Sequence, residues 1–114
     1  MTEHQSAAQQ SLGGFADKLV SLTDDVLFED VWKRPDLAPR DRSLITIAAL
    51  VAGGNTEQLP FHLALGQRNG LTDTEIVEAI THLAFYTGWP RAMSAITTAR
   101  ATLTGGDDTE RDGR

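Results

Sequence analysis

Residues 44–52 read LITIAALVA, and this stretch decides the fold class. It is apolar on nearly every side of a helix, yet it is far shorter than the ~20 residues that cross a bilayer. The run is compatible with a buried strand, but its length and its alanines favour a helix. A helix without a polar face has to be surrounded by other elements. We therefore predict a core helix here, and we expect residues 44–52 to be the most buried segment of the protein.

The residues that flank this run supply helix boundaries. Pro39 suits the first turn of the core helix, and the pair Gly53–Gly54 suits its end. Asn55 is followed three residues later by Gln58, a spacing that resembles a capping box. The sequence therefore predicts a second helix that begins at Asn55, or later if Pro60 in its early turns delays the start, and that ends at Gly70.

The next helix has the strongest start signal in the chain. Thr72 and Glu75 have the spacing of a capping box, and Leu71 and Ile76 stand where a hydrophobic staple requires them. The apolar positions that follow trace one helical face as far as Gly88. We predict a helix that begins after Thr72 and ends at this glycine.

Two further helices are expected at the outer parts of the chain. Thr23, followed by two aspartates, predicts a helix that ends before Pro35. Pro90 predicts another, which ends before Gly105. No strand pattern with alternating apolar residues and turn dipeptides occurs anywhere. The fold class is therefore predicted to be all-α, with about five to six helices joined by short loops.

Composition predicts how the chain is divided. Residues 1–20 are expected to be loosely ordered, residues 21–103 to form one helical domain, and residues 104–114 to be a disordered acidic tail. The 114 residues carry a net charge of −6, which disfavours nucleic acid and anionic membranes as partners. The chain has neither a leader pattern nor an apolar run that spans a bilayer, so we expect a cytoplasmic protein.

Two of the three histidines are placed for chemistry, since His4 lies in the loose N-terminal segment. His62 follows Gln58 by four positions and Glu57 by five. A carboxylate near an imidazole raises the pKa of the histidine and makes a usable acid/base pair. A half-exposed histidine beside an unrelated acid has the same spacing, so the spacing alone leaves both interpretations open.

The second histidine belongs to a polar stripe. His82 follows Glu78 by four positions and Glu75 by seven, and it precedes Tyr86 by four. Residues at these spacings share one side of a helix, so the four groups form a stripe rich in donors and acceptors. A solvated outer face with one favourable Glu–His pair explains the same pattern.

Other candidate residues are less specific. Tyr86, Trp89 and Trp32 are more typical of a core or an interface than of a substrate site. Arg42 precedes the core run and is suited either to a substrate carboxylate or to a nearby aspartate. The usable histidines are too few and too far apart in the sequence for a three-residue metal site, and no glycine-rich phosphate loop occurs.

Four motifs in order resemble the carboxymuconolactone decarboxylase family, within the AhpD-like superfamily. They are VWKRPDL at 31–37, RSLITIA at 42–48, His62 followed by NGLT at 69–72, and HLAFYTGWP at 82–90. The resemblance implies an all-α fold like that of the alkylhydroperoxidase AhpD. It also implies a homotrimer or homohexamer with active sites between helices near the subunit contacts.

The family has a peroxidase branch and a decarboxylase branch. In the peroxidase branch a Cys-x-x-Cys pair precedes the histidine, and counting back from His62 puts those places at Asn55 and Gln58. The chain has no cysteine, so it can form neither a disulfide nor a thiolate nucleophile. In the decarboxylase branch the same segment carries glutamate near the histidine, as Glu57 does here, although the Gln58 place is commonly glutamate there.

The resemblance therefore implies a cofactor-free lyase of the 4-carboxymuconolactone decarboxylase type, acting on a small carboxylated lactone or a related keto or enol acid. We assign His62 as general acid/base, Glu57 as its partner, and His82 with Tyr86 as hydrogen-bond donors to the substrate. Lesser substrate-binding candidates are Arg42, Trp89 and Gln58. Two alternatives stay open, because one fold hosts different functions. One is an isomerase or dehydratase of a biosynthetic pathway, and the other is a non-catalytic oligomeric binding module.

Overall fold

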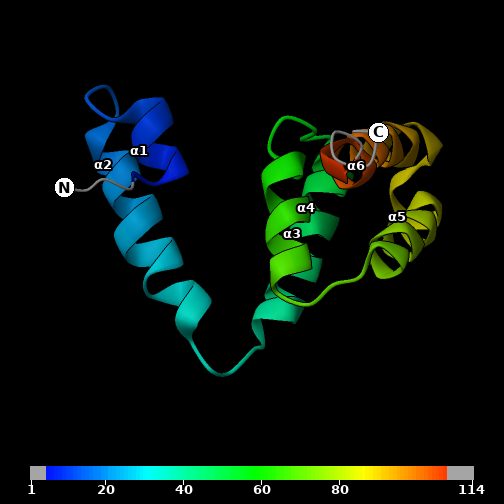
Figure 1. Cartoon of the computed structure of the whole chain (residues 1–114), viewed down its shortest axis with the longest axis horizontal. Helices are drawn as coiled ribbons and strands as arrows, with labels where there is room; N and C mark the ends of the chain where they lie inside the picture. The colour runs from blue at the N-terminus through cyan, green and yellow to red at the C-terminus, as the bar shows by residue number, and fades with distance from the viewer. Residues whose placement is uncertain (1–4, 108–114) are drawn as a thin grey trace. The chain divides into compact units, whose positions relative to one another are not determined.

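The structure, a computed structural model, describes residues 5–107, and every regular element within this range is a helix (Figure 1). The all-α prediction is confirmed. The chain divides into two compact units, one up to Leu37 and one from Ala38 onward. This boundary falls inside the range 21–103 that composition predicts to be one domain. Among the described residues, no helix is both long enough and apolar enough to cross a bilayer.

The first unit is a series of short helices. They are α1 (Ala7–Leu12), α2 (Asp17–Ser21), the π-helix η1 (Leu22–Phe28) and the 3₁₀-helix η2 (Val31–Lys33). The described part of segment 1–20 thus contains two helices where composition predicts loose order. The predicted helix start at Thr23 is wrong, because the chain is already helical from Asp17 and Thr23 has no free helix end to cap. Its hydroxyl instead donates to the carbonyl of Leu19 at 2.8 Å.

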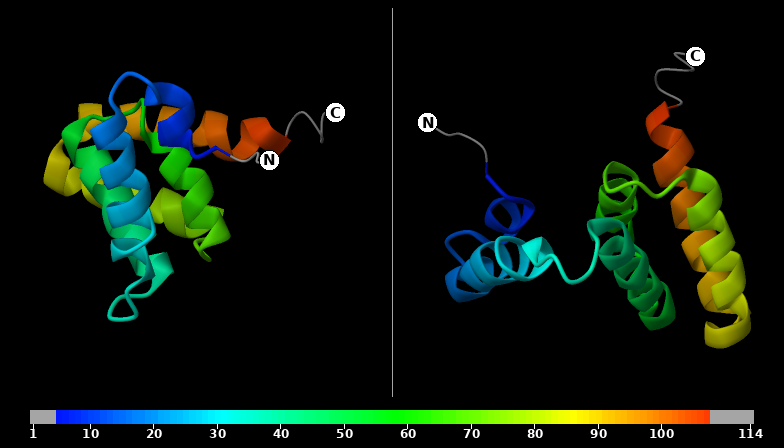
Figure 2. Two further views of the ribbon diagram at one scale, coloured as in Figure 1. Left: turned by 90° about the vertical axis from the view of Figure 1, so that its left-hand side faces the viewer. Right: turned by 90° about the horizontal axis from the view of Figure 1, so that it is seen from below.

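The second unit contains four longer helices. They are α3 (Pro39–Gly53), α4 (Leu59–Arg68), α5 (Asp73–Thr87) and α6 (Trp89–Asp107). Helices α5 and α6 pack along each other (Figure 2), α3 packs against α4 and α5, and α4 packs against α6. Their apolar sides meet in one core, whose fully buried large residues are Ile47, Leu59, Leu63, Ile76, Ile80 and Val51.

Helix α3 carries the apolar run, but only one of its sides is buried in the single chain. Ile47 and Val51 lie in the core, together with the buried Ser43, whose hydroxyl oxygen accepts a hydrogen bond from Nδ2 of Asn69 at 3.0 Å. Ile45 is 59% exposed. The prediction that 44–52 is the most buried segment is therefore wrong for one chain, because the helices that pack on α3 within its unit leave one side uncovered.

The helix boundaries follow proline and glycine more closely than polar caps. Helix α3 begins at Pro39 and ends at Gly53; the next residue, Gly54, caps it with a φ of 72°, a left-handed backbone that favours glycine. The predicted capping box of Asn55 and Gln58 is wrong. The backbone N–H of Asn55 instead donates to the backbone carbonyl of Leu50 at 2.9 Å, so Asn55 completes the end of α3. Helix α4 begins at Leu59 without a side-chain cap.

The C-terminal helix runs further than the sequence predicts. Helix α6 begins at Trp89, with Pro90 in its first turn, and continues to Asp107. It therefore extends past Gly105, where we predicted its end. The remainder of the predicted acidic tail, 108–114, lies outside the described residues.

The capping box at the start of α5 is confirmed. The hydroxyl of Thr72 accepts from the amide of Glu75 at 3.1 Å, and a carboxylate oxygen of Glu75 accepts from the amide of Thr72 at 2.9 Å. Replacing Thr72 with alanine is expected to lower the free energy of unfolding by about 1 kcal/mol, because one amide loses its partner. Thr74→Ala, in the same turn but outside the box, is the control. Equal losses of stability in urea unfolding for both variants would contradict this role.

Candidate active site

His62 lies in the first half of α4, after the loop that follows α3. The side chain is half-buried with a buried Nδ1, and its ring meets the ring of Phe61 edge-on at 5.0 Å. Burial lowers the pKa of His62 below its ordinary value, because the charged imidazolium loses water contacts. A neutral imidazole is therefore the favoured form at neutral pH, and this form accepts a proton; the ring can donate one only after it has been protonated.

Glu57 does not act on His62 as the spacing predicts. Glu57 lies exposed in the loop, and within the described residues no hydrogen bond or ion pair joins it to His62. The expectation of a raised pKa for His62 is therefore wrong, because burial dominates. Gln58 is also exposed, and its backbone N–H donates to the backbone carbonyl of Asn55 at 3.3 Å. The loop thus presents Glu57 and Gln58 next to His62 along the chain without fixing their side chains.

The lowered pKa of His62 has a measurable effect on stability. Above about pH 6.5 the imidazole is neutral in both the folded and the unfolded chain. As the pH falls below this value, the unfolded chain binds a proton first, so the free energy of unfolding decreases. Relative to His62→Gln, which does not titrate, the original protein should lose stability between about pH 7.5 and about pH 5.5. Urea unfolding gives the free energy of unfolding of the original protein and of His62→Gln. If the difference between the two proteins is the same at both pH values, the pKa of His62 is not lowered.

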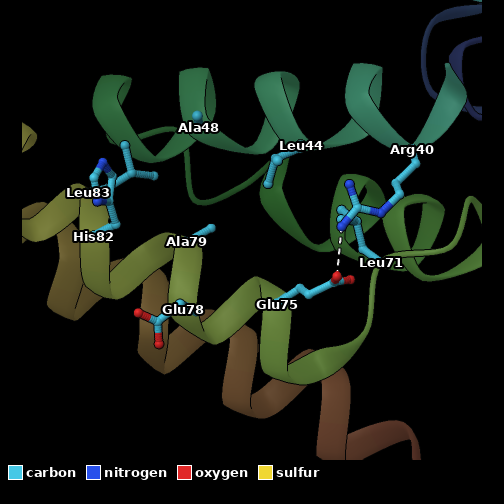
Figure 3. Close-up of a pocket in the computed structure, with 9 residues that line it drawn as sticks. All are labelled: Arg40, Leu44, Ala48, Leu71, Glu75, Glu78, Ala79, His82 and Leu83. Carbon is cyan, nitrogen blue, oxygen red and sulfur yellow. Dashed lines mark hydrogen bonds and ion pairs between the residues drawn. The ribbon is translucent and has the colours of Figure 1, made fainter.

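A pocket of about 460 Å³ lies between α3 and α5 (Figure 3). Its walls are mainly apolar, and its lining residues are Arg40, Leu44, Ala48, Leu71, Glu75, Glu78, Ala79, His82 and Leu83. Figure 3 shows the contact between Arg40 and Glu75 at one end and His82 at the other. The volume is within the range of small-molecule sites.

The charges of this pocket do not favour an anion. Nη2 of Arg40 donates to Glu75 at 2.7 Å, and Nη1 of Arg40 lies 3.3 Å from Asp41. The contact with Glu75 raises the pKa of Arg40, and the amide of Thr72 and Arg40 together lower the pKa of Glu75. Glu78 adds a second carboxylate to the lining. The single cation is thus already neutralised, and a carboxylated substrate gains no net attraction here.

Arg40 and its ion pair were not predicted from the sequence. The spacing of Arg40, Leu44 and Ala48 places them on one side of α3, whereas Arg42, two residues from Arg40, lies on another side. Arg42 is half-buried and does not line this pocket. The four-residue spacing was visible in the sequence, but the partner of Arg40 lies 35 positions away and follows only from the packing of α5 on α3.

The polar stripe on α5 forms in part as predicted. Glu75, Glu78 and His82 line the pocket together, and the ring of His82 stacks on that of Tyr86 at 5.0 Å. Tyr86 is 76% exposed. The stripe therefore begins inside the pocket and ends on the surface.

The remaining site candidates lie apart from this pocket. Trp89 is exposed and meets the ring of Phe85 edge-on at 5.3 Å. His62 is not among the residues that line the pocket with His82. That the two imidazoles share a site stays a prediction. In the part of the chain that the structure describes, no cluster of three or more histidine, aspartate or glutamate side chains is arranged to hold a metal.

Comparisons with known proteins place these features in a family. The sequence profile of the Carboxymuconolactone decarboxylase family matches residues 17–101. A 4-carboxymuconolactone decarboxylase of Acinetobacter baylyi is 33% identical over 94 residues, which cover 82% of this chain and 70% of that protein. Nitrosuccinic acid decarboxylase npaB of Metarhizium robertsii is 34% identical over 73 residues, which cover 64% of this chain and 51%, about half, of that relative. The chain therefore belongs to the carboxymuconolactone decarboxylase family.

Proposed function

We propose that this protein is a cofactor-free decarboxylase of a small carboxylated lactone or a related keto or enol acid. The observation that carries the proposal is similarity over most of the chain to a protein that is named a decarboxylase. A second relative, named for a different substrate, is also a decarboxylase. The chemistry common to the two names is the loss of a carboxyl group, and this is the reaction type that we propose.

The reaction requires the protein to position the substrate and to supply one acid. The bond between the carboxylate carbon and the ring carbon breaks, and CO₂ leaves. The electron pair of that bond moves into the conjugated double bond and the lactone carbonyl, which gives an enolate. One proton then adds to carbon and completes the product. A half-buried imidazole that takes up a proton from its surroundings can donate it in this step.

We assign His62 as the general acid/base, with Glu57 and Gln58 as neighbours that contact the substrate from the preceding loop. Arg42 and Trp89 are proposed to anchor and enclose the substrate. His82 and Tyr86 are proposed to donate hydrogen bonds to the same substrate.

The assignment of His82 requires a second copy of the chain. Since the pocket with His82 does not contain His62 in one chain, we propose that the two histidines meet across a subunit contact in a homotrimer or homohexamer. The exposed side of α3 at Ile45 and the exposed rings of Phe85 and Tyr86 give such a contact apolar area to bury.

The experiment is release of CO₂ by the purified, dialysed protein from 4-carboxymuconolactone and from nitrosuccinate. We expect turnover of one of these acids, or of a close analogue, well above the rate in buffer. Conversion of the acids to isomers or dehydrated products without CO₂ would instead support the isomerase or dehydratase alternative. Binding without any conversion would support the binding module.

The same preparation is expected to reduce no alkyl hydroperoxide with a dithiol as electron donor. Asn55 and Gln58 stand where the peroxidase branch carries its cysteines, and without sulfur no sulfenate forms. The measurement is consumption of the hydroperoxide by metal-free protein. A rate above that of buffer would contradict the placement of this chain outside the peroxidase branch.

A further inference from the structure

A second, smaller groove lies between the α3–α4 loop and α6. Its volume is about 370 Å³, and its lining residues are Thr56, Met93, Ser94, Thr97 and Thr98. The hydroxyl of Thr97 donates to the carbonyl of Met93 at 2.9 Å. Within the described residues, the hydroxyls of Thr56, Ser94 and Thr98 form no hydrogen bond to the protein. The groove therefore offers three hydroxyls to a ligand.

Arg91 is not one of the lining residues, but it lies on α6 three residues before Ser94, and its side chain reaches the end of α3. Its guanidinium rests against Gly54, so closely that a Cβ on Gly54 would collide with Nη1. Gly54 precedes Thr56 by two positions. On α6, the spacing of Arg91, Ser94 and Thr98 places them on one side of the helix. Arg91 therefore shares one side of α6 with two of the free hydroxyls.

The charge of Arg91 has no acidic partner in the described part of the chain. No ion pair between described residues involves Arg91. The groove next to it is lined by hydroxyl groups and Met93 and contains no carboxylate. Guanidinium and hydroxyl groups together supply donors that suit a carboxylate.

We propose that this groove binds a carboxylate group of a small organic acid, with Arg91 as its ion partner. The class of ligand rests on the proposed function. A substrate with a second carboxylate keeps that carboxylate when the first leaves as CO₂, and a cation is needed to bind it. The groove begins at Thr56, one residue before Glu57. A carboxylate held by Arg91 therefore places the rest of the acid beside the loop that carries Glu57 and Gln58.

A purely structural role for Arg91 is the competing explanation. The end of α3 carries the negative end of its helix dipole, and a cation at Gly54 stabilises that end. Such a role lowers stability when the charge is removed, but it does not require that an acid binds. Binding and stability therefore separate the two explanations.

The test is titration of the whole chain with succinate at constant ionic strength, followed by amide chemical shifts. The variants are Arg91→Gln and Arg100→Gln. Arg100 is an exposed arginine on the same helix, and the spacing of nine residues puts it on the opposite side from Arg91. We expect shifts at Thr56, Ser94 and Thr98, roughly tenfold weaker binding in Arg91→Gln, and unchanged binding in Arg100→Gln.

Two results overturn the proposal. One is equal binding by all three proteins, with or without a loss of stability in Arg91→Gln, which leaves Arg91 only a structural role. The other is equal weakening in both variants, which indicates non-specific attraction. The test needs no turnover, so succinate binding at Arg91 in a protein that decarboxylates nothing would refute the proposed function and retain the site.

Discussion

Replacing His62 with glutamine is expected to lower kcat for decarboxylation by about two to four orders of magnitude. Glutamine keeps much of the size and polarity of the side chain but cannot exchange a proton near neutral pH. The proton that completes the product then has to come from water without a positioned donor. The measurement is the rate of CO₂ release by the two proteins under saturating substrate.

The matched control for this prediction is His82→Gln. His82 is assigned as a hydrogen-bond donor and not as the acid, so its replacement should cost less than that of His62. Circular dichroism of both variants should show the helical content of the original protein. A larger loss of kcat in His82→Gln than in His62→Gln would reverse the two roles.

Replacing Ile76 with alanine is expected to lower the free energy of unfolding by about 2–5 kcal/mol. Ile76 is fully buried at the start of α5, and its side chain packs in the core that joins the four helices of the second unit. Removing its three outer carbons loses apolar burial and leaves a cavity. The measurement is the midpoint and slope of urea unfolding.

Val77 gives the control, since it is the next residue on the same helix and is 45% exposed. Val77→Ala should change the free energy of unfolding by no more than about 0.5 kcal/mol, as is usual for surface positions. Similar losses in the two variants would mean that α5 presents a different side to the core.

The sequence predicted the helices best where a local signal has a local cause. Pro39 starts α3, Thr72 and Glu75 cap α5, and Gly88 ends it, as the sequence predicts. The capping box requires only two side chains and two amides within four residues, so no distant part of the chain is needed. The motifs around His62 and His82 indicated the family for a related reason, since they can be compared position by position.

The sequence was misleading where the outcome depends on distant packing. Thr23 has the residue type of a helix cap, but the helix already begins upstream at Asp17. The apolar run on α3 suggested burial on all sides, whereas its unit covers one side and leaves Ile45 exposed. The spacing of residues along a helix shows which of its sides are apolar, but it does not show how many other helices pack against it.

In the candidate site, too, the features that the sequence did not predict depend on how distant residues pack. The spacing of Glu57 and His62 predicted an acid/base pair, but burial rather than the acid controls the pKa of His62. The contact of Arg40 with Glu75 joins residues on α3 and α5, and the contact of Arg91 with Gly54 joins α6 to the end of α3. Neither contact has a sequence signal, because each depends on how the helices pack.

We propose that His62, a positioned acid, delivers a proton to the enolate that remains after CO₂ has left. The most direct measurement is turnover of the accepted acid in D₂O, with the product examined by NMR. We expect one deuterium on one face of the carbon that takes up the proton, because His62 lies on a single side of the substrate. Deuterium in equal amounts on both faces would show that the enolate is protonated by solvent after release, which would contradict the claim.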